Sequence, residues 1–96
     1  MGKLCQVKII RIDGRVEHHE IPKGILSRKV HELIGAETFD CVALKQGKVM
    51  IVDDSGAIDG KPINPEGTKI YQEKCGYITP NSIHGDVAIC TDSDFA

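Results

Sequence analysis

Three short segments in the C-terminal half of this 96-residue chain decide its fold. The first reads Val52-Asp53-Asp54-Ser55-Gly56, the second Gly60-Lys61-Pro62-Ile63-Asn64-Pro65-Glu66-Gly67-Thr68, and the third His84-Gly85-Asp86-Val87-Ala88-Ile89-Cys90. They predict a strand that ends in an acidic turn, a loop that enters a sharply capped helix, and a glycine turn before a last strand. Together they indicate a compact α+β unit, and none of them is a catalytic signature.

The second segment has the features of a helix N-terminus. Asn64 is a preferred N-cap residue, and Pro65 suits the first helical position, where its missing N–H costs nothing. We expect this helix to run to about Lys74. Gly67 costs about 1 kcal/mol relative to alanine inside a helix, so we expect it to permit close packing of the helix on the sheet.

The N-terminal half predicts a hairpin, a helix and a second hairpin. Residues 4–12 and 15–21 flank Asp13-Gly14, which is typical of a type I′ turn, and the polar second strand suits a sheet edge. Residues 25–34 place apolar side chains at helical spacing and stop at Gly35. Residues 39–44 and 48–52 form a more apolar hairpin, so we place both of its strands in the sheet centre.

These elements follow one another in the order ββαββαβ. We therefore expect one α+β domain over residues 1–96, with a mixed or antiparallel sheet of about five strands and two helices. A helix laid between two hairpins suggests a β-grasp-like fold. The segment after the last strand, residues 91–96, is expected to be a short acidic tail.

Composition and charge limit the classes of function. Apolar residues make up 41% of the chain, and no apolar run reaches the roughly 20 residues of a membrane span, so we expect a cytoplasmic protein. The net charge of −2 predicts no bulk attraction to nucleic acid. Residues 1–48 carry nine Lys/Arg and six Asp/Glu, whereas residues 49–96 carry three and eight. This asymmetry indicates two opposed faces, a head-to-tail alignment of subunits, or simply solvated surface.

Four cysteines lie far apart in the sequence and have no metal-site or redox-pair spacing. Cys5, Cys41 and Cys90 fall inside apolar strands, where we expect buried, reduced thiols that contribute to packing. A disulfide is the alternative. Cys75 follows a helix C-terminus, where the helix dipole disfavours a thiolate.

The chain resembles a family of small uncharacterised proteins of bacteria, their phages and mobile elements. The resemblance rests on the N-terminal hairpin, the helix end at Leu33-Ile34-Gly35, the strand followed by Asp54-Ser55-Gly56, the helix start of residues 62–68, and Gly85 to Ile89. Gly67 stands where the family pattern has a small residue such as alanine. The resemblance implies a phage or mobile-element context and transfers no catalytic residue.

No residue pattern predicts catalysis or a metal. His18 and His19 are adjacent on a strand and therefore point to opposite faces. Asp in glycine-rich turns is typical of backbone hydrogen bonding, and Ser55 and Thr68 lack the context of a nucleophile. We expect a protein that is not an enzyme and has no cofactor and no bound metal.

The helix start at Asn64 is the candidate binding site. Its free N–H groups and positive dipole end can hold an anion such as the phosphate of a nucleotide. We assign to this site Lys61, Asn64, Gly67, Thr68 and Tyr77. Ordinary capping by Asn64 is the alternative. Further basic contacts could come from a neighbouring subunit through Arg11, Arg15, Arg28 and Lys29.

Two functions follow from these patterns. In the first, a homo-oligomer of a phage or mobile element sequesters a small anionic ligand, such as a nucleotide signal of host defence. In the second, the domain inhibits or adapts a host protein through an acidic face or an exposed strand edge.

Overall fold

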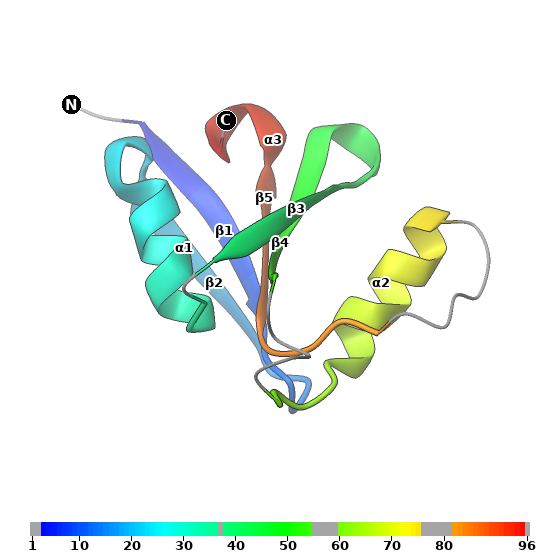
Figure 1. Cartoon of the computed structure of the whole chain (residues 1–96). Coiled ribbons are helices and arrows are strands. Elements are labelled where there is room, and N and C mark those ends of the chain that lie inside the picture. Colours follow the sequence, from blue (N-terminus) through cyan, green and yellow to red (C-terminus); the bar gives the residue numbers. More distant parts are fainter. Residues whose placement is uncertain (1–2, 37, 55–59, 76–81, 96) are drawn as a thin grey trace.

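A computed structural model describes residues 3–36, 38–54, 60–75 and 82–95, with only the backbone of Lys74 and Cys75. Within these residues one five-stranded sheet carries helices on both faces (Figure 1). Every pair of neighbouring strands is antiparallel. The prediction of a small α+β fold with a five-stranded sheet is therefore confirmed, and of the two predicted sheet types the antiparallel one is present.

The sheet has the strand order β2-β1-β5-β4-β3. Its strands are β1 (Leu4–Ile10), β2 (Val16–Pro22), β3 (Phe39–Ala43), β4 (Lys48–Asp53) and β5 (Val87–Thr91). The helices are α1 (Leu26–Ile34), α2 (Pro65–Cys75) and α3 (Asp92–Phe95), with short 3-10 turns η1 (Lys23–Ile25) before α1 and η2 (Lys45–Gly47) between β3 and β4.

The position of β3 differs from the prediction. The second hairpin was placed in the sheet centre, but β3 is an edge strand and only β4 is interior. The last strand, β5, is central instead, and it pairs with both β1 and β4. Its Val87, Ala88 and Cys90 are buried, which fits a strand covered on both faces. The predicted edge position of β2 is confirmed.

The first hairpin turn is not of type I′. Gly14 has a φ of 91°, but Asp13 does not adopt a positive φ. Gly14 N donates to Arg11 O at 3.0 Å, and Arg11 N donates to Arg15 O at 2.8 Å. This is a three-residue loop in which the glycine supplies the single left-handed position. The dipeptide Asp13-Gly14 therefore predicted the hairpin correctly and the turn type wrongly.

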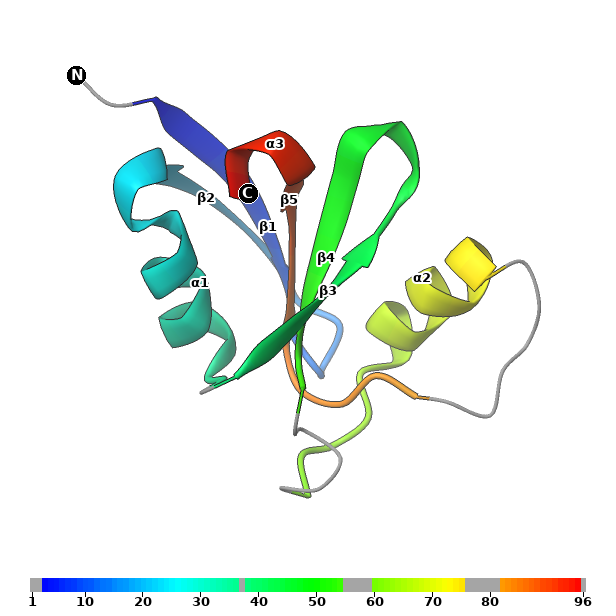
Figure 2. The ribbon, with the colours of Figure 1, turned by 45° about the horizontal axis from the view of Figure 1, so that its top comes forward.

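Helix α1 covers one face of the sheet, as Figure 2 shows. Leu26, Val30 and Ile34 are its buried residues, and they pack in one core cluster with residues of β1, β4 and β5. Gly35 ends the helix in the left-handed conformation at a φ of 67°, as predicted. The apolar stripe and its stop signal are thus local features that the fold uses directly.

The acidic tail contains a short helix that the sequence did not indicate. In α3, Phe95 stacks edge-on against Phe39 with ring centroids 5.4 Å apart. Asp94, which is buried, forms an ion pair with Lys3 from the other end of the chain. Lys3 lowers the pKa of Asp94 below its ordinary value through this hydrogen bond. Contacts with distant residues therefore hold this segment in place.

The prediction of three buried cysteines is wrong for one of them. Cys5 and Cys90 are buried, whereas Cys41 is exposed on the edge strand β3. Burial raises the pKa of the Cys90 thiol to about 11, which keeps it protonated and unreactive. The side chain of Cys75 lies outside the described residues.

Candidate functional site

The helix start at Asn64 is a buried joint between α2, the end of β1 and the loop before β5. Asn64 is fully buried. Its amide nitrogen donates to Ile10 O and to Gly85 O, each at 3.0 Å, and its amide oxygen accepts from Gly67 N at 2.9 Å. One side chain therefore caps the helix and fastens it to two other segments.

The residues around Asn64 are bonded to the segment 83–85. Thr68 Oγ1 accepts from Ile83 N at 2.9 Å, and Gly85 N donates to Pro62 O at 2.8 Å. The side chain of His84 contacts Lys61 O at 2.8 Å through Nδ1. With these contacts, His84 in the loop before β5 forms an antiparallel β-bridge with Ile63. The Thr68 hydroxyl and the Asn64 amide, which were expected to meet an anion, bond to this loop.

Gly67 permits close packing, but not on the sheet. A Cβ built at this position would lie 3.3 Å from Asn64 Cγ and 3.4 Å from Ile83 Cγ2. The absence of a side chain therefore makes room for the cap and for the loop before β5. The expectation of close approach is confirmed, and its partner is a different segment from the one expected.

Lys61 points away from the helix start. Its amine is ion-paired with Asp53, whose side chain is only 2% exposed, and it donates to Gly35 O at 2.8 Å. The lysine thus joins the end of β4 to the end of α1. The structure brings Lys61, Asn64, Gly67 and Thr68 into one region and engages the polar groups described above internally. Tyr77, the fifth predicted site residue, lies outside the described residues.

Arg11 is the centre of a cluster of charged side chains, and the sequence did not predict this cluster. Its guanidinium donates to both carboxylate oxygens of Glu17, at 2.8 and 2.9 Å, to Asp86 at 2.8 Å and to Leu33 O at 2.6 Å. The hydrogen bonds from Arg11, and next that from His19, lower the pKa of Glu17 to about 2. A predicted contact to a neighbouring subunit is therefore an internal clamp.

The charge asymmetry along the chain is partly neutralised by the fold. Arg11 pairs with Asp86 and Lys3 pairs with Asp94, so basic residues of the first half meet acidic residues of the second. Asp86 and Asp94, two of the residues that would form an acidic face, are thus paired with basic side chains. The sequence signal was the opposite sign of the two halves, but it did not identify the partners.

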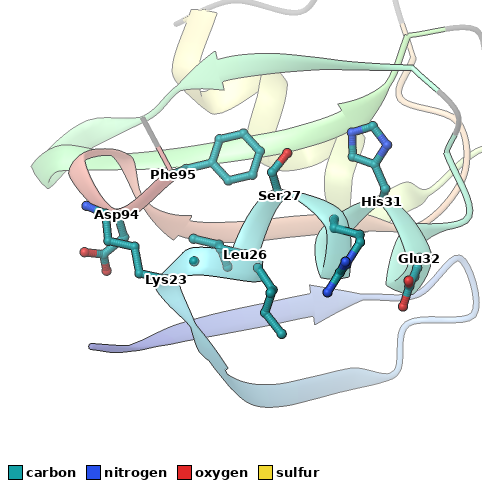
Figure 3. Close-up of a pocket in the computed structure, with 10 residues that line it drawn as sticks. Lys23, Leu26, Ser27, His31, Glu32, Asp94 and Phe95 are labelled. Carbon is teal, nitrogen blue, oxygen red and sulfur yellow. The ribbon is translucent and has the colours of Figure 1, made fainter. Parts of the chain in front are cut away.

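Several hollows open on the surface of the described residues. One of about 690 Å³ lies between the start of α1 and α3 (Figure 3). Its charged lining is mixed, with Lys23, Arg28, Glu32 and Asp94. The adjoining rings are already used in packing, since His31 stacks edge-on against Phe39 with centroids 4.4 Å apart. This hollow therefore lies where α3 packs beside η1 and α1. Its lining has no excess of either charge.

Two further hollows measure about 250 Å³ each. One lies beside Lys61 and Gly85, next to the joint described above. The other lies between α2 and the sheet, with Ile70 and Ile89 in its lining and two lysines, Lys45 and Lys48. The sequence contained the signal for this second hollow, since an apolar central strand and a lysine-rich turn meet there, but only the strand order brings them together.

Comparisons with known proteins found no matching family model, no matching curated protein and no matching solved structure. Within the described residues, no three His, Cys, Asp or Glu side chains gather as potential metal ligands. No helix there combines the length and the hydropathy needed to span a membrane. The resemblance to small proteins of phages and mobile elements stays a prediction.

Proposed function

We propose that this chain is a non-enzymatic binding protein of a phage or mobile element that engages a host protein by strand addition at the free edge of β2. The context rests on the sequence resemblance, and a role in opposing host defence belongs to the same proposal. The mode of binding rests on the state of the two sheet edges. Of the two functions considered from the sequence, the partner-binding one has the stronger support.

The backbone of β2 presents a row of hydrogen-bonding groups to solvent. Arg11 N donates to Arg15 O, and Lys23 N donates to Lys3 O at 2.9 Å. In this register, every second residue from Arg15 to Lys23 points its backbone N–H and C=O groups toward β1. The alternate residues Val16, His18 and Glu20 point their backbone N–H and C=O groups outward, away from β1. Within the described residues no acceptor meets these three N–H groups. This open edge is the observation that carries the proposal.

On the opposite edge, a side chain of β3 already occupies one of the outward N–H groups. Leu44 N donates to Lys48 O at 2.8 Å, which turns Phe39, Cys41 and Ala43 outward on β3. At the middle of this edge, Cys41 N donates to Asp40 Oδ1 at 2.9 Å. One outward N–H of β3 is therefore already bonded to a side chain of its own strand. The contrast between the two edges favours β2 as the surface kept open for a partner.

Strand addition supplies affinity through main-chain hydrogen bonds and specificity through alternate side chains. On β2 the exposed side chains Val16, His18 and Glu20 lie on one face, and the half-buried Glu17 and His19 on the other. Glu17 is already engaged with Arg11. A matching partner strand therefore places a basic residue opposite Glu20.

A proline at His18 tests this function. Because the His18 N–H points away from β1, His18→Pro removes a donor that the sheet itself does not use. His18→Ala keeps the donor and is the matched control. Proteins retained by the wild-type chain from host cells are identified, and the affinity of the purified partner is measured for all three chains. We expect His18→Pro to weaken binding by at least about tenfold, or about 1.4 kcal/mol, and His18→Ala to bind like wild type.

Equal affinity of the proline variant would overturn the proposal. A concentration-dependent dimer that the proline variant abolishes, measured by light scattering after gel filtration, would show that β2 accepts a second copy instead of a host protein. Homo-oligomer formation is therefore decided by the same set of variants.

Sequestration of a small anionic ligand is a second candidate. The polar groups at the Asn64 helix start are engaged internally, which reduces the support for a ligand there. The observation that favours an anion elsewhere is the lysine-lined hollow beside α2. A β-grasp-like classification is likewise a proposal, supported by the position of α1 between two hairpins.

A further inference from the structure

The face of the sheet opposite α1 is only partly covered. Helix α2 lies on this face, as both ribbon views show (Figures 1 and 2). Ile10, Met50, Val52 and Val87 are buried there, with Ile70 packed against them. Ile89 is only half-buried, although it belongs to the central strand β5. A half-buried isoleucine at the centre of a sheet marks a place that α2 leaves open.

A hollow of about 250 Å³ occupies this place. Leu44, Ile70 and Ile89 supply its apolar lining. An apolar body of that size would cover the exposed parts of these three side chains.

Lysines surround this apolar lining. Lys45 and Lys48 line the hollow, and Lys8 is paired in register with Ile89 and therefore lies on the same face. Among the described residues none of the three lysines forms an ion pair, and Lys48 donates only to Thr91 Oγ1 at 3.3 Å. Glu73 is the one acidic side chain in the lining. Two lysines against one glutamate in the lining, with Lys8 beside Ile89, are a local positive excess in a chain of net charge −2.

We propose that this hollow binds a small anion with an apolar body, which places that body on Ile70 and Ile89 and its charge between Lys45 and Lys48. Charge complementarity selects an anion, because the lining holds two lysines against one glutamate. The apolar lining selects a ligand with a hydrocarbon or planar part over a bare inorganic anion. An alkyl carboxylate and a nucleoside monophosphate share this chemistry.

The proposal is independent of strand addition, because the hollow and the β2 edge have no lining residue in common. The experiment titrates octanoate, AMP, octylammonium and inorganic phosphate into the full-length chain. Calorimetry gives affinities, and amide chemical shifts locate the site. We expect octanoate or AMP to bind saturably, with the largest shifts at Leu44, Ile70 and Ile89. We expect no saturable binding of octylammonium or phosphate.

Charge reversal then identifies the contacts. Because Lys48 is exposed, we expect the Lys48→Glu chain to fold like wild type. We expect this substitution to weaken binding at least about tenfold. Lys29→Glu is the matched control, because Lys29 lies on α1 at the other face of the sheet, and we expect its affinity to equal that of wild type. The His18→Pro variant is also expected to bind like wild type, so a failure of strand addition does not affect this result.

The following outcomes would overturn the proposal. They are equal binding of octanoate and octylammonium, shifts that map to the Asn64 helix start, and an unchanged affinity of Lys48→Glu. Binding of neither octanoate nor AMP would also overturn it. Binding of octanoate alone identifies a hydrocarbon ligand, and binding of AMP alone identifies a nucleotide.

Discussion

The side-chain amide of Asn64 donates to the backbone oxygen of Ile10 at 3.0 Å, across 54 positions of sequence. This bond attaches the start of α2 to the last residue of β1. A second bond from the same amide nitrogen reaches Gly85 O. Asn64 thus acts as a cap and as a tie between three segments, and the candidate anion site becomes a structural joint.

Replacement of Asn64 by aspartate distinguishes a joint from an ordinary cap. Asn and Asp are about equal as exposed N-caps, but an aspartate carboxylate cannot donate to Ile10 O and Gly85 O. We expect Asn64→Asp and Asn64→Ala each to lower the free energy of unfolding by about 2–4 kcal/mol. Urea denaturation measures this change. An Asn64→Asp chain as stable as wild type would show that the two donated bonds contribute nothing.

Lys61 is expected to act on stability. Lys61→Ala leaves the buried Asp53 carboxylate without this cation, and we expect a loss of about 1–3 kcal/mol in the free energy of unfolding. Lys69→Ala, an exposed lysine on α2, is the control and is expected to stay within about 0.5 kcal/mol of wild type.

The double variant Lys61→Ala with Asp53→Asn is expected to recover part of the loss, because it removes the uncompensated charge. Losses that simply add in the double variant would refute direct coupling between the two side chains. The same stability loss makes Lys61→Ala unsuitable as a binding variant unless its fold is checked first.

The clamp around Arg11 predicts a pH dependence. Arg11 lowers the pKa of Glu17 from 4.5 to about 2, so the folded state favours the carboxylate. The stabilisation is fully present above about pH 4.5 and is lost as the pH falls from 4.5 toward 2. We expect Glu17→Gln to be less stable than wild type at pH 7, and the two chains to converge in urea midpoint near pH 2.

Glu20→Gln, which changes an exposed carboxylate on the same strand, controls for the general effect of charge removal. A difference between Glu17→Gln and wild type that stays constant from pH 7 to pH 2 would show that Glu17 does not titrate in this way.

The three described cysteines are expected to differ in reactivity. Cys41 is exposed on β3, whereas Cys5 and Cys90 are each 1% exposed. Native labelling with N-ethylmaleimide, followed by peptide mass spectrometry, is expected to modify Cys41 first. Cys5 and Cys90 are expected to react only through opening of the sheet. Simultaneous labelling of all three thiols would contradict the burial of β1 and β5.

Much of the local structure was predictable because neighbouring residues encode it. The apolar stripe of α1 ends at Gly35, whose left-handed conformation lacks a steric penalty. Asn64 and Pro65 marked the start of α2, and Asp13-Gly14 marked a hairpin. The polar composition of β2 indicated an edge strand, and β2 lies at an edge of the sheet. Each of these features depends on residues within one or two turns of the chain.

The sequence predicted which residues lie together at the candidate site, but it did not predict which groups they bind. Lys61, Asn64, Gly67 and Thr68 do gather near the helix start, yet their partners are Gly35, Asp53, Ile83 and Gly85. A helix N-terminus indicates available donors, and it does not indicate whether protein or ligand meets them. The partner depends on which distant loop packs there.

The sequence by itself determined the five strands, the helices α1 and α2, their order along the chain and the edge character of β2, because periodicity and capping are short-range properties. Only the tertiary structure decided that β5 lies between β1 and β4, that Cys41 is exposed, and that Lys45 and Lys48 line one apolar hollow with Lys8 beside its Ile89. These outcomes depend on strand order. Strand order is set by the joint burial of residues far apart in the chain, which no local pattern specifies.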